Sequence, residues 1–129
     1  MNRNRLPIIL LLGLSCLIAG CGKNVHLGGR VTFEDGTPLT FGKVTFATET
    51  FQAEGVIQQN GEYRLGSLHE HDGIPPGTYK VFLLGTEDTS GDVGRSRVAQ
   101  NFCDRQLTPL QFEVSKNGPK TFDFQVSKP

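Results

Sequence analysis

Apolar residues that recur at every second position, between turn-forming residues, constrain the fold of this chain more than any other feature. The clearest runs are Val25, Leu27, Val31 and Phe33, then Tyr79, Val81 and Leu83, then Leu110, Phe112 and Val114, and finally Phe122, Phe124 and Val126. A period of two gives an extended strand one buried and one solvated face, which is typical of antiparallel sheets. Chain-reversal signals separate the runs: Asp35-Gly36 with Pro38, Asn60-Gly61, Pro75-Pro76-Gly77 and Asn117-Gly118-Pro119.

This pattern predicts seven strands, and no segment after residue 24 shows sustained helical periodicity. The expected strands are 25–33, 42–47, 52–57, 62–66, 78–85, 109–114 and 120–126. Asn60-Gly61 is the strongest hairpin signal. Phe82 and Leu84 add apolar side chains to the second face of strand 78–85, so we expect that strand to be central or covered by a loop. Because an isolated sheet would leave an apolar face in water, the sequence predicts an all-β, antiparallel Greek-key sandwich of two sheets.

The N-terminus has the parts of a secretory signal. Arg3 and Arg5 precede an apolar stretch over 6–18, which is short for a membrane span of ~20 residues. The following Ile18-Ala19-Gly20-Cys21 resembles the lipobox of bacterial lipoproteins. That resemblance implies cleavage before Cys21, a diacylglyceryl group on its thiol and an acylated amine. An ordinary signal peptide with a chance cysteine is the alternative.

The predicted organisation is therefore a signal peptide at 1–20, a lipidated cysteine and short linker at 21–24, and one domain at 25–129. Cleavage leaves 109 of the 129 residues and, since Arg3 and Arg5 are lost, a formal net charge of −2. Nothing in this balance indicates a nucleic-acid partner. The predicted location is the cell envelope, held to a membrane by lipid. Gly22 stands where some bacteria use aspartate for inner-membrane retention, which favours the outer membrane.

Cysteine usage predicts no disulfide in the exported domain. Cys16 leaves with the signal and Cys21 carries lipid, so only Cys103 remains. We interpret it as a small buried hydrophobe rather than a reactive thiol.

Several short motifs together resemble a known family. They are Gly29-Arg30-Val31-Thr32, Asp35-Gly36-Thr37-Pro38-Leu39, Gly42-Lys43-Val44-Thr45-Phe46, Gly61-Glu62-Tyr63 and Ile74-Pro75-Pro76-Gly77-Thr78-Tyr79-Lys80-Val81. They are similar to the carboxypeptidase regulatory-like, or transthyretin-like, β-sandwich domains, and the resemblance extends over nearly all of 25–129. It implies a fold and carries little on function, because the matched residues are turn and core positions.

Catalytic patterns are missing from the sequence, so we predict no enzyme activity and no cofactor. There is no Gly-x-Ser-x-Gly elbow, phosphate loop or His-Glu-x-x-His motif. The transthyretin-like fold also hosts a hydrolase of a purine-derived substrate, but its terminal Tyr-Arg-Gly-Ser-type motif does not occur here. His69 and His71 would share one side of an extended segment, beside Asp72, a spacing that can hold a metal. A solvated connection is the competing interpretation, and we predict no metal site there.

The long connection over 86–106 is the candidate ligand or partner loop, since such connections are usually binding loops or disordered segments. Its candidate contact residues are Asp92, Arg95, Arg97 and Arg105. Phe102 is expected to anchor its second half. A solvated, variable loop is the alternative.

Three functional hypotheses follow from these features. The first is a non-catalytic binding or structural module that contacts an envelope protein or polysaccharide. The second is a periplasmic metal or small-ligand binder that uses the His69–Asp72 loop, and the third is an accessory subunit of an envelope enzyme.

Strands that alternate up and down would also fix which loops share an end. The connections 34–41, 58–61 and 86–108 would lie at one end, and 48–51, 67–77 and 115–119 at the end that holds Val25. Arg95 and Arg97 would then point away from the membrane. Lys23, Lys116 and Lys120 would lie close to it.

Overall fold

The computed structural model describes residues 24–66, 72–88 and 95–129, and this part of the chain is all β. Its strands are β1 (Gly28–Phe33), β2 (Lys43–Ala47), β3 (Gln52–Val56), β4 (Glu62–Arg64), β5 (Gly77–Leu84), β6 (Glu87–Asp88), β7 (Arg95–Ser96), β8 (Gln111–Val114) and β9 (Phe124–Val126). A single 3-10 turn, η1 (Gln100–Cys103), is the helical element within the described ranges. All seven predicted strands are present, as β1–β5, β8 and β9. In the same ranges, no helix is long and apolar enough to span a membrane.

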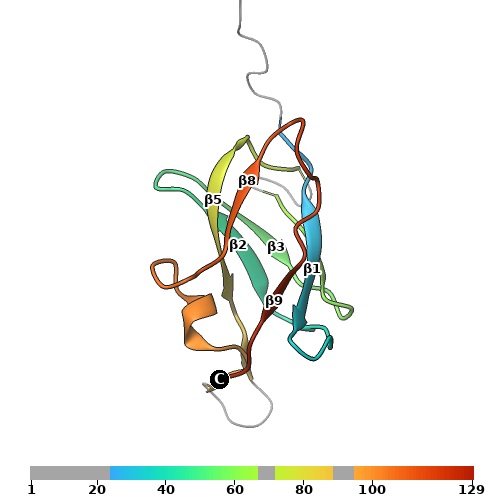
Figure 1. The fold of residues 1–129 in the computed structure, drawn as a ribbon, viewed down its shortest axis with the longest axis vertical. Coiled ribbons are helices and arrows are strands. Elements are labelled where there is room, and N and C mark those ends of the chain that lie inside the picture. Colours follow the sequence, from blue (N-terminus) through green and yellow to red (C-terminus); the bar gives the residue numbers. More distant parts are fainter. Residues whose placement is uncertain (1–23, 67–71, 89–94) are drawn as a thin grey trace, which may run out of the picture.

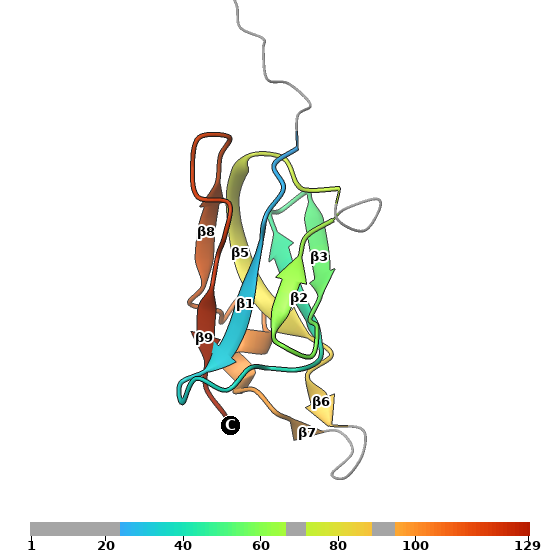
Figure 2. The same cartoon turned by 90° about the vertical axis from the view of Figure 1, so that its right-hand side faces the viewer.

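Two sheets face each other and form the two layers of the molecule (Figures 1 and 2). The small sheet has the strand order β4-β1-β9, and the large sheet has the order β3-β2-β5-β8. The aromatic rings of Phe46 on β2 and Phe122, just before β9, meet across the interface with centroids 6.2 Å apart. The main core residues are Val25, Leu27, Val31, Leu39, Val44, Phe46, Tyr63, Leu65, Ile74, Tyr79, Val81, Leu83, Val114, Phe124 and Val126. Every buried core residue described therefore lies between Val25 and Val126.

The alternation read from the sequence is confirmed by burial. On β5, Tyr79, Val81 and Leu83 are at most 2% exposed and face the core, whereas Lys80 is exposed on the other face. Phe82, on that outer face, is only 6% exposed. The prediction that this strand is central holds, because β5 lies between β2 and β8.

The prediction of a purely antiparallel sandwich is wrong for one pair of strands. β1 and β9 are parallel, with Val31 opposite Phe124 and Phe33 opposite Val126. The cause is topological. Seven major strands that alternate in direction leave the first and the last running the same way, and here those two strands are neighbours.

The predicted Asn60-Gly61 hairpin is half right. The turn forms, with Gly61 N donating to Gln58 O at 2.9 Å, but it leads from β3 in the large sheet to β4 in the small sheet. β3 and β4 share only an isolated bridge between Glu54 and Gly66. Gly55 allows the chain to pass from the large sheet to the small sheet here, because a Cβ at this position would lie 2.4 Å from the carbonyl oxygen of Arg64. The backbone of β4 thus packs directly onto β3 at this edge of the sandwich.

The long connection is more ordered than the sequence suggested. Its described ends form a short ribbon of β6 and β7, and η1 follows. Phe102, within η1, packs against the core, which confirms its predicted anchoring role. No sequence pattern pointed to the two-residue strands.

The predicted alternation of strand direction is confirmed by the pairing, and it separates two ends of the molecule. At one end, Val25 N donates to Ile74 O at 2.7 Å and Ile74 N donates back to Val25 O at 2.9 Å. The turn at 115–119 lies at this end (Figure 1). The ribbon of β6 and β7 and the turn after β1 lie at the opposite end (Figures 1 and 2). We call these the proximal and the distal end.

Candidate functional site

Several of the predicted site residues fall outside the described part of the chain. These are Cys21, His69, His71 and Asp92. The predicted signal peptide lies outside it as well. Asp72 is described at the proximal end, where its backbone oxygen accepts a hydrogen bond from Asn24 Nδ2 at 3.3 Å. Among the residues that are described, no three metal-ligating side chains come together.

The structure brings two of the three described candidate arginines together. Arg95 lies on β7 and Arg97 follows it, both at the distal end. Arg97 donates through Nε and Nη2 to Asp88 Oδ2, with the Nε contact at 3.0 Å. Asp88 was not singled out from the sequence, although Arg95 is its partner in the antiparallel register. The ion pair between Arg97 and Asp88 links the end of β7 to β6.

Arg105 does not join the ribbon. Its guanidinium donates to the carbonyl oxygen of Thr48, at the end of β2. The hydroxyl of Thr108 donates to Val81 O at 2.6 Å, so the turn after η1 is tied to the large sheet at two points. The role of Arg105 in the structure is to hold this turn.

Cys103 is a free, half-buried thiol packed against the core. Its Sγ lies 3.4 Å from Thr86 Oγ1 and 3.8 Å from Ser96 Oγ. The packing agrees with the predicted small hydrophobe, whereas the two neighbouring hydroxyls give it more polar surroundings than predicted.

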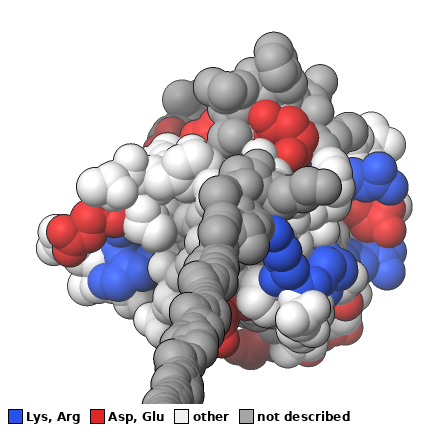
Figure 3. Space-filling model, turned by 90° about the horizontal axis from the view of Figure 1, so that it is seen from above, with Lys and Arg blue, Asp and Glu red and all other residues white. Residues whose placement is uncertain are grey.

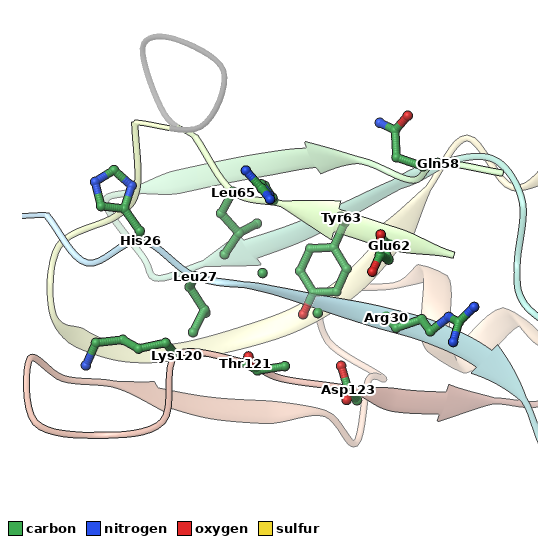
Figure 4. Close-up of a pocket in the computed structure, with 13 residues that line it drawn as sticks. His26, Leu27, Arg30, Gln58, Glu62, Tyr63, Leu65, Lys120, Thr121 and Asp123 are labelled. Atoms are coloured by element: carbon green, nitrogen blue, oxygen red, sulfur yellow. The ribbon is translucent and has the colours of Figure 1, made fainter. Parts of the chain in front are cut away.

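A hollow of about 910 Å³ opens on the outer face of the small sheet, and the sequence did not predict it (Figure 4). Its floor is β1 at Gly28 and Gly29, with β4 on one side and the segment 120–123 on the other. The ionisable side chains around it are His26, Arg30, Glu62, Arg64, Lys120 and Asp123. Gly28 was the available signal, because a strand residue without a side chain leaves space on the sheet face toward which it points.

Tyr63 supports the hollow from the core side. Gly29 is its partner on β1, and the Tyr63 hydroxyl donates to Phe122 O at 2.6 Å beyond that glycine. A Cβ at Gly29 would lie 2.0 Å from the same carbonyl oxygen. Burial, reinforced by the negative charge of Asp123, raises the pKa of Tyr63 far above its usual range. The phenol is therefore a fixed hydrogen-bond donor that links β4 to the strand region before β9.

Fold and site together define a two-sheet, all-β domain with a charged distal ribbon and a polar hollow on its small sheet. No protein-family model matches the chain, and no curated protein matches its sequence. Among solved structures, a DUF3823 family protein from Bacteroides ovatus is 19% identical, with a TM-score of 0.47. The match covers 81% of this chain and 45% of that one, so the chain spans less than half of that protein's length.

Proposed function

We propose that this protein is a lipoprotein of the bacterial cell envelope that acts as a non-catalytic binding or structural module. Cleavage before Cys21 and acylation of that residue anchor the domain to a membrane, with the outer membrane favoured. The observation that carries the proposal is the bridge between Val25 and Ile74, which ties the chain into the domain four residues after Cys21. The intervening Gly22, Lys23 and Asn24 can reach ~10 Å at most. The proximal end therefore stays near the lipid head groups.

We also propose that the domain has the Greek-key connectivity of the transthyretin-like sandwiches. The order β5-β2-β3-β4 supports this, if the bridge between Glu54 and Gly66 is counted as the link from β3 to β4. Four successive strands whose fourth lies beside the first form the Greek-key pattern. In such a frame the strands carry most of the core, and residues of the connections such as Leu39 and Ile74 complete it.

The distal ribbon is the surface that we assign to a partner, an envelope protein or polysaccharide. It lies at the end opposite Val25, and Arg97 is held there by Asp88 (Figure 2). Because the ion pair already holds Arg97 against Asp88, the ribbon loses little conformational entropy when it binds a partner. An anchored domain would present this end to the periplasm or the cell exterior.

Mass spectrometry of the protein purified from membranes tests the anchor. The N-terminal peptide should begin at Cys21 and carry the mass of its acyl chains. Cys21→Ala should either release the domain or leave the precursor uncut, whereas Cys103→Ala should be processed normally. A mature chain that starts at another residue and carries no lipid would contradict the proposal.

Site-specific photo-crosslinking in intact membranes tests the ribbon. A photoreactive residue in place of Arg95 should give one adduct of defined mass. The matched control is Gln59, an exposed residue in another distal turn, where the adduct should be absent. Equal crosslinking at both positions, or none at Arg95, would show that the ribbon is not the contact surface.

A further inference from the structure

A gap on the outer face of the small sheet creates the hollow described above. Residues of β1 alternate, so Val31 faces the core while Gly28 and Arg30 face outward. Gly28 lies between Arg64 on β4 and Thr121 beside β9. Since Gly28 has no side chain, the two flanking residues enclose an open space above the backbone.

Arg64 lies across this space. Its Cγ is 3.4 Å from where a Cβ of Gly28 would stand, so its aliphatic stem rests over the glycine. Arg64 is exposed and, within the described structure, its side chain has no hydrogen bond or ion pair. A guanidinium carries five N–H donors in a planar fork that matches the oxygens of a phosphate group. The donors of Arg64 are all available to a ligand.

The charges around the hollow are divided along β1. His26 and Lys120 lie toward the proximal end, and Arg30, Glu62 and Asp123 lie toward the other end (Figure 4). Arg64 is opposite Gly28, next to the basic group. Both carboxylates of the hollow are thus on its far side, and the half nearer the proximal end is basic.

Lys120 and Arg30 differ from Arg64 in that their side chains already donate hydrogen bonds within the protein. Lys120 Nζ donates to the carbonyl oxygens of Ser115, Lys116 and Gly118, which occupies its three N–H groups. Arg30 donates through Nε to Asn60 O at 2.8 Å. Lys120 therefore contributes positive charge to the hollow without a free donor. Arg30 lies opposite Glu62, on the side of the carboxylates, whereas Arg64 lies opposite Gly28 and is the better placed to contact an anion.

The basic half opens toward the proximal end, where Val25 lies. Figure 3 looks onto this end and shows lysine and arginine side chains at several places on it, with acidic side chains among them. In a lipoprotein tethered through Cys21, this is the end next to the lipid head groups, which carry phosphate.

We propose that the hollow, with Arg64 at its centre, binds the phosphate of an anionic phospholipid headgroup. This assignment rests on the proposed function for its choice of lipid as the source of phosphate. Binding would add a second contact to the acyl anchor and fix how the domain stands on the membrane. Basic side chains that meet an anionic surface in this way each strengthen binding by about fivefold.

Vesicle binding by the segment 24–129 tests the proposal independently of acylation. This segment omits Cys21 but contains every buried core residue of the described structure, so it retains the fold. It should bind vesicles of phosphatidylcholine mixed with phosphatidylglycerol, and bind pure phosphatidylcholine much less. Arg64→Gln should weaken binding by about fivefold. The matched control Arg30→Gln removes the same charge from the same sheet face but should change binding far less.

Thr121→Glu is a second variant that leaves the fold intact, since Thr121 is exposed, and places a carboxylate beside the site. It should abolish vesicle binding while its thermal unfolding stays unchanged. If Arg64→Gln and Arg30→Gln weaken vesicle binding equally, or if neither weakens it, Arg64 is not the centre of a phosphate site. Inorganic phosphate that binds in an Arg64-dependent manner, without vesicle binding, would overturn the lipid source. If mass spectrometry shows no acyl group on Cys21 but the vesicle results are as expected, the proposed lipid anchor is wrong and the phosphate site at Arg64 is still supported.

Discussion

At the scale of single residues, the least predictable contact is the one between Tyr63 and Phe122. The sequence predicts that Tyr63 is buried, because it follows the period of two. It does not predict that the ring lies beside Gly29 and donates to a carbonyl oxygen 59 residues later in the chain. Such a bond depends on which strands become neighbours, and local patterns do not encode that. Gly29 resembles an ordinary strand glycine until the close approach of Phe122 is known.

The phenols of this protein should make it sensitive to alkali. Burial raises the pKa of both Tyr63 and Tyr79, so each keeps its proton in the folded state at a pH where the unfolded chain loses it. Their contribution to stability is full below about pH 10 and is lost as the pH rises beyond it. For Tyr63, the more deeply buried of the two, ionisation of the unfolded chain lowers the free energy of unfolding by about 1.4 kcal/mol per pH unit above pH 10. Urea-denaturation midpoints should therefore be flat from pH 7 to 9 and fall above pH 10.

Tyr63→Phe separates the two phenols. At neutral pH it should destabilise the fold by ~1–3 kcal/mol, because Phe122 O loses its donor in a buried position. Above pH 10 its midpoint should fall less steeply than that of the wild type, and Tyr79→Phe is the matched variant. A decline as steep as that of the wild type would show that Tyr63 ionises normally.

At the scale of secondary-structure elements, the sequence predicts the strands well and their partners poorly. Alternation and turn residues are local, so strand existence and facing could be inferred, as on β5. Pairing is not local. The Asn60-Gly61 turn was expected to join two strands of one sheet, but it leads from one sheet to the other, since Gly55 allows β4 to lie on β3. The hollow could not be predicted for the same reason. Gly28 forms its floor only because Arg64 and Thr121 lie on either side of it, and that depends on strand pairing.

Gly55→Ala should therefore destabilise the domain by ~1–3 kcal/mol or more, as overpacking against a backbone does. The new Cβ would stand 2.4 Å from Arg64 O, and neither strand can move without losing its ladder. Gly36→Ala is the control, because a Cβ there meets nothing within 4 Å and only its φ of +90° is strained. That strain costs about 1–2 kcal/mol. The urea-denaturation midpoint should be highest for the wild type, lower for Gly36→Ala and lowest for Gly55→Ala. A Gly55→Ala midpoint equal to that of the wild type would contradict the close packing of β4 on β3 at Gly55.

At the scale of the whole molecule, the two ends are the feature that sequence reasoning could reach. Alternating directions for seven strands assign each loop to one end before any pairing is known. The structure confirms this assignment for Ile74, which lies beside Val25, and for the ribbon at the far end. The last part of the connection 86–108 is an exception, because Arg105 donates to Thr48 O in the predicted proximal connection 48–51. A domain with the proposed anchor at one end and a charged ribbon at the other would have a defined direction relative to a membrane. Under the proposed function, the lipid and the partner would contact different parts of the domain, so each could change without disturbing the other.

This direction is measurable with an environment-sensitive dye on single cysteines. Asn117 lies in the proximal turn and Gln59 in a distal one, and both are exposed. Each is replaced by cysteine in a Cys103→Ser background, in which the proposed acylation would block the thiol of Cys21, and the protein is labelled in membranes. The dye at 117 should report the polarity of the lipid interface and the dye at 59 that of water, because the short tether holds the proximal end within ~10 Å of the anchor. The Cys103→Ser parent measures background labelling. Identical spectra at both positions would mean that the domain tumbles freely on its linker, and a reversed result would mean that the ribbon, not the proximal turn, faces the bilayer.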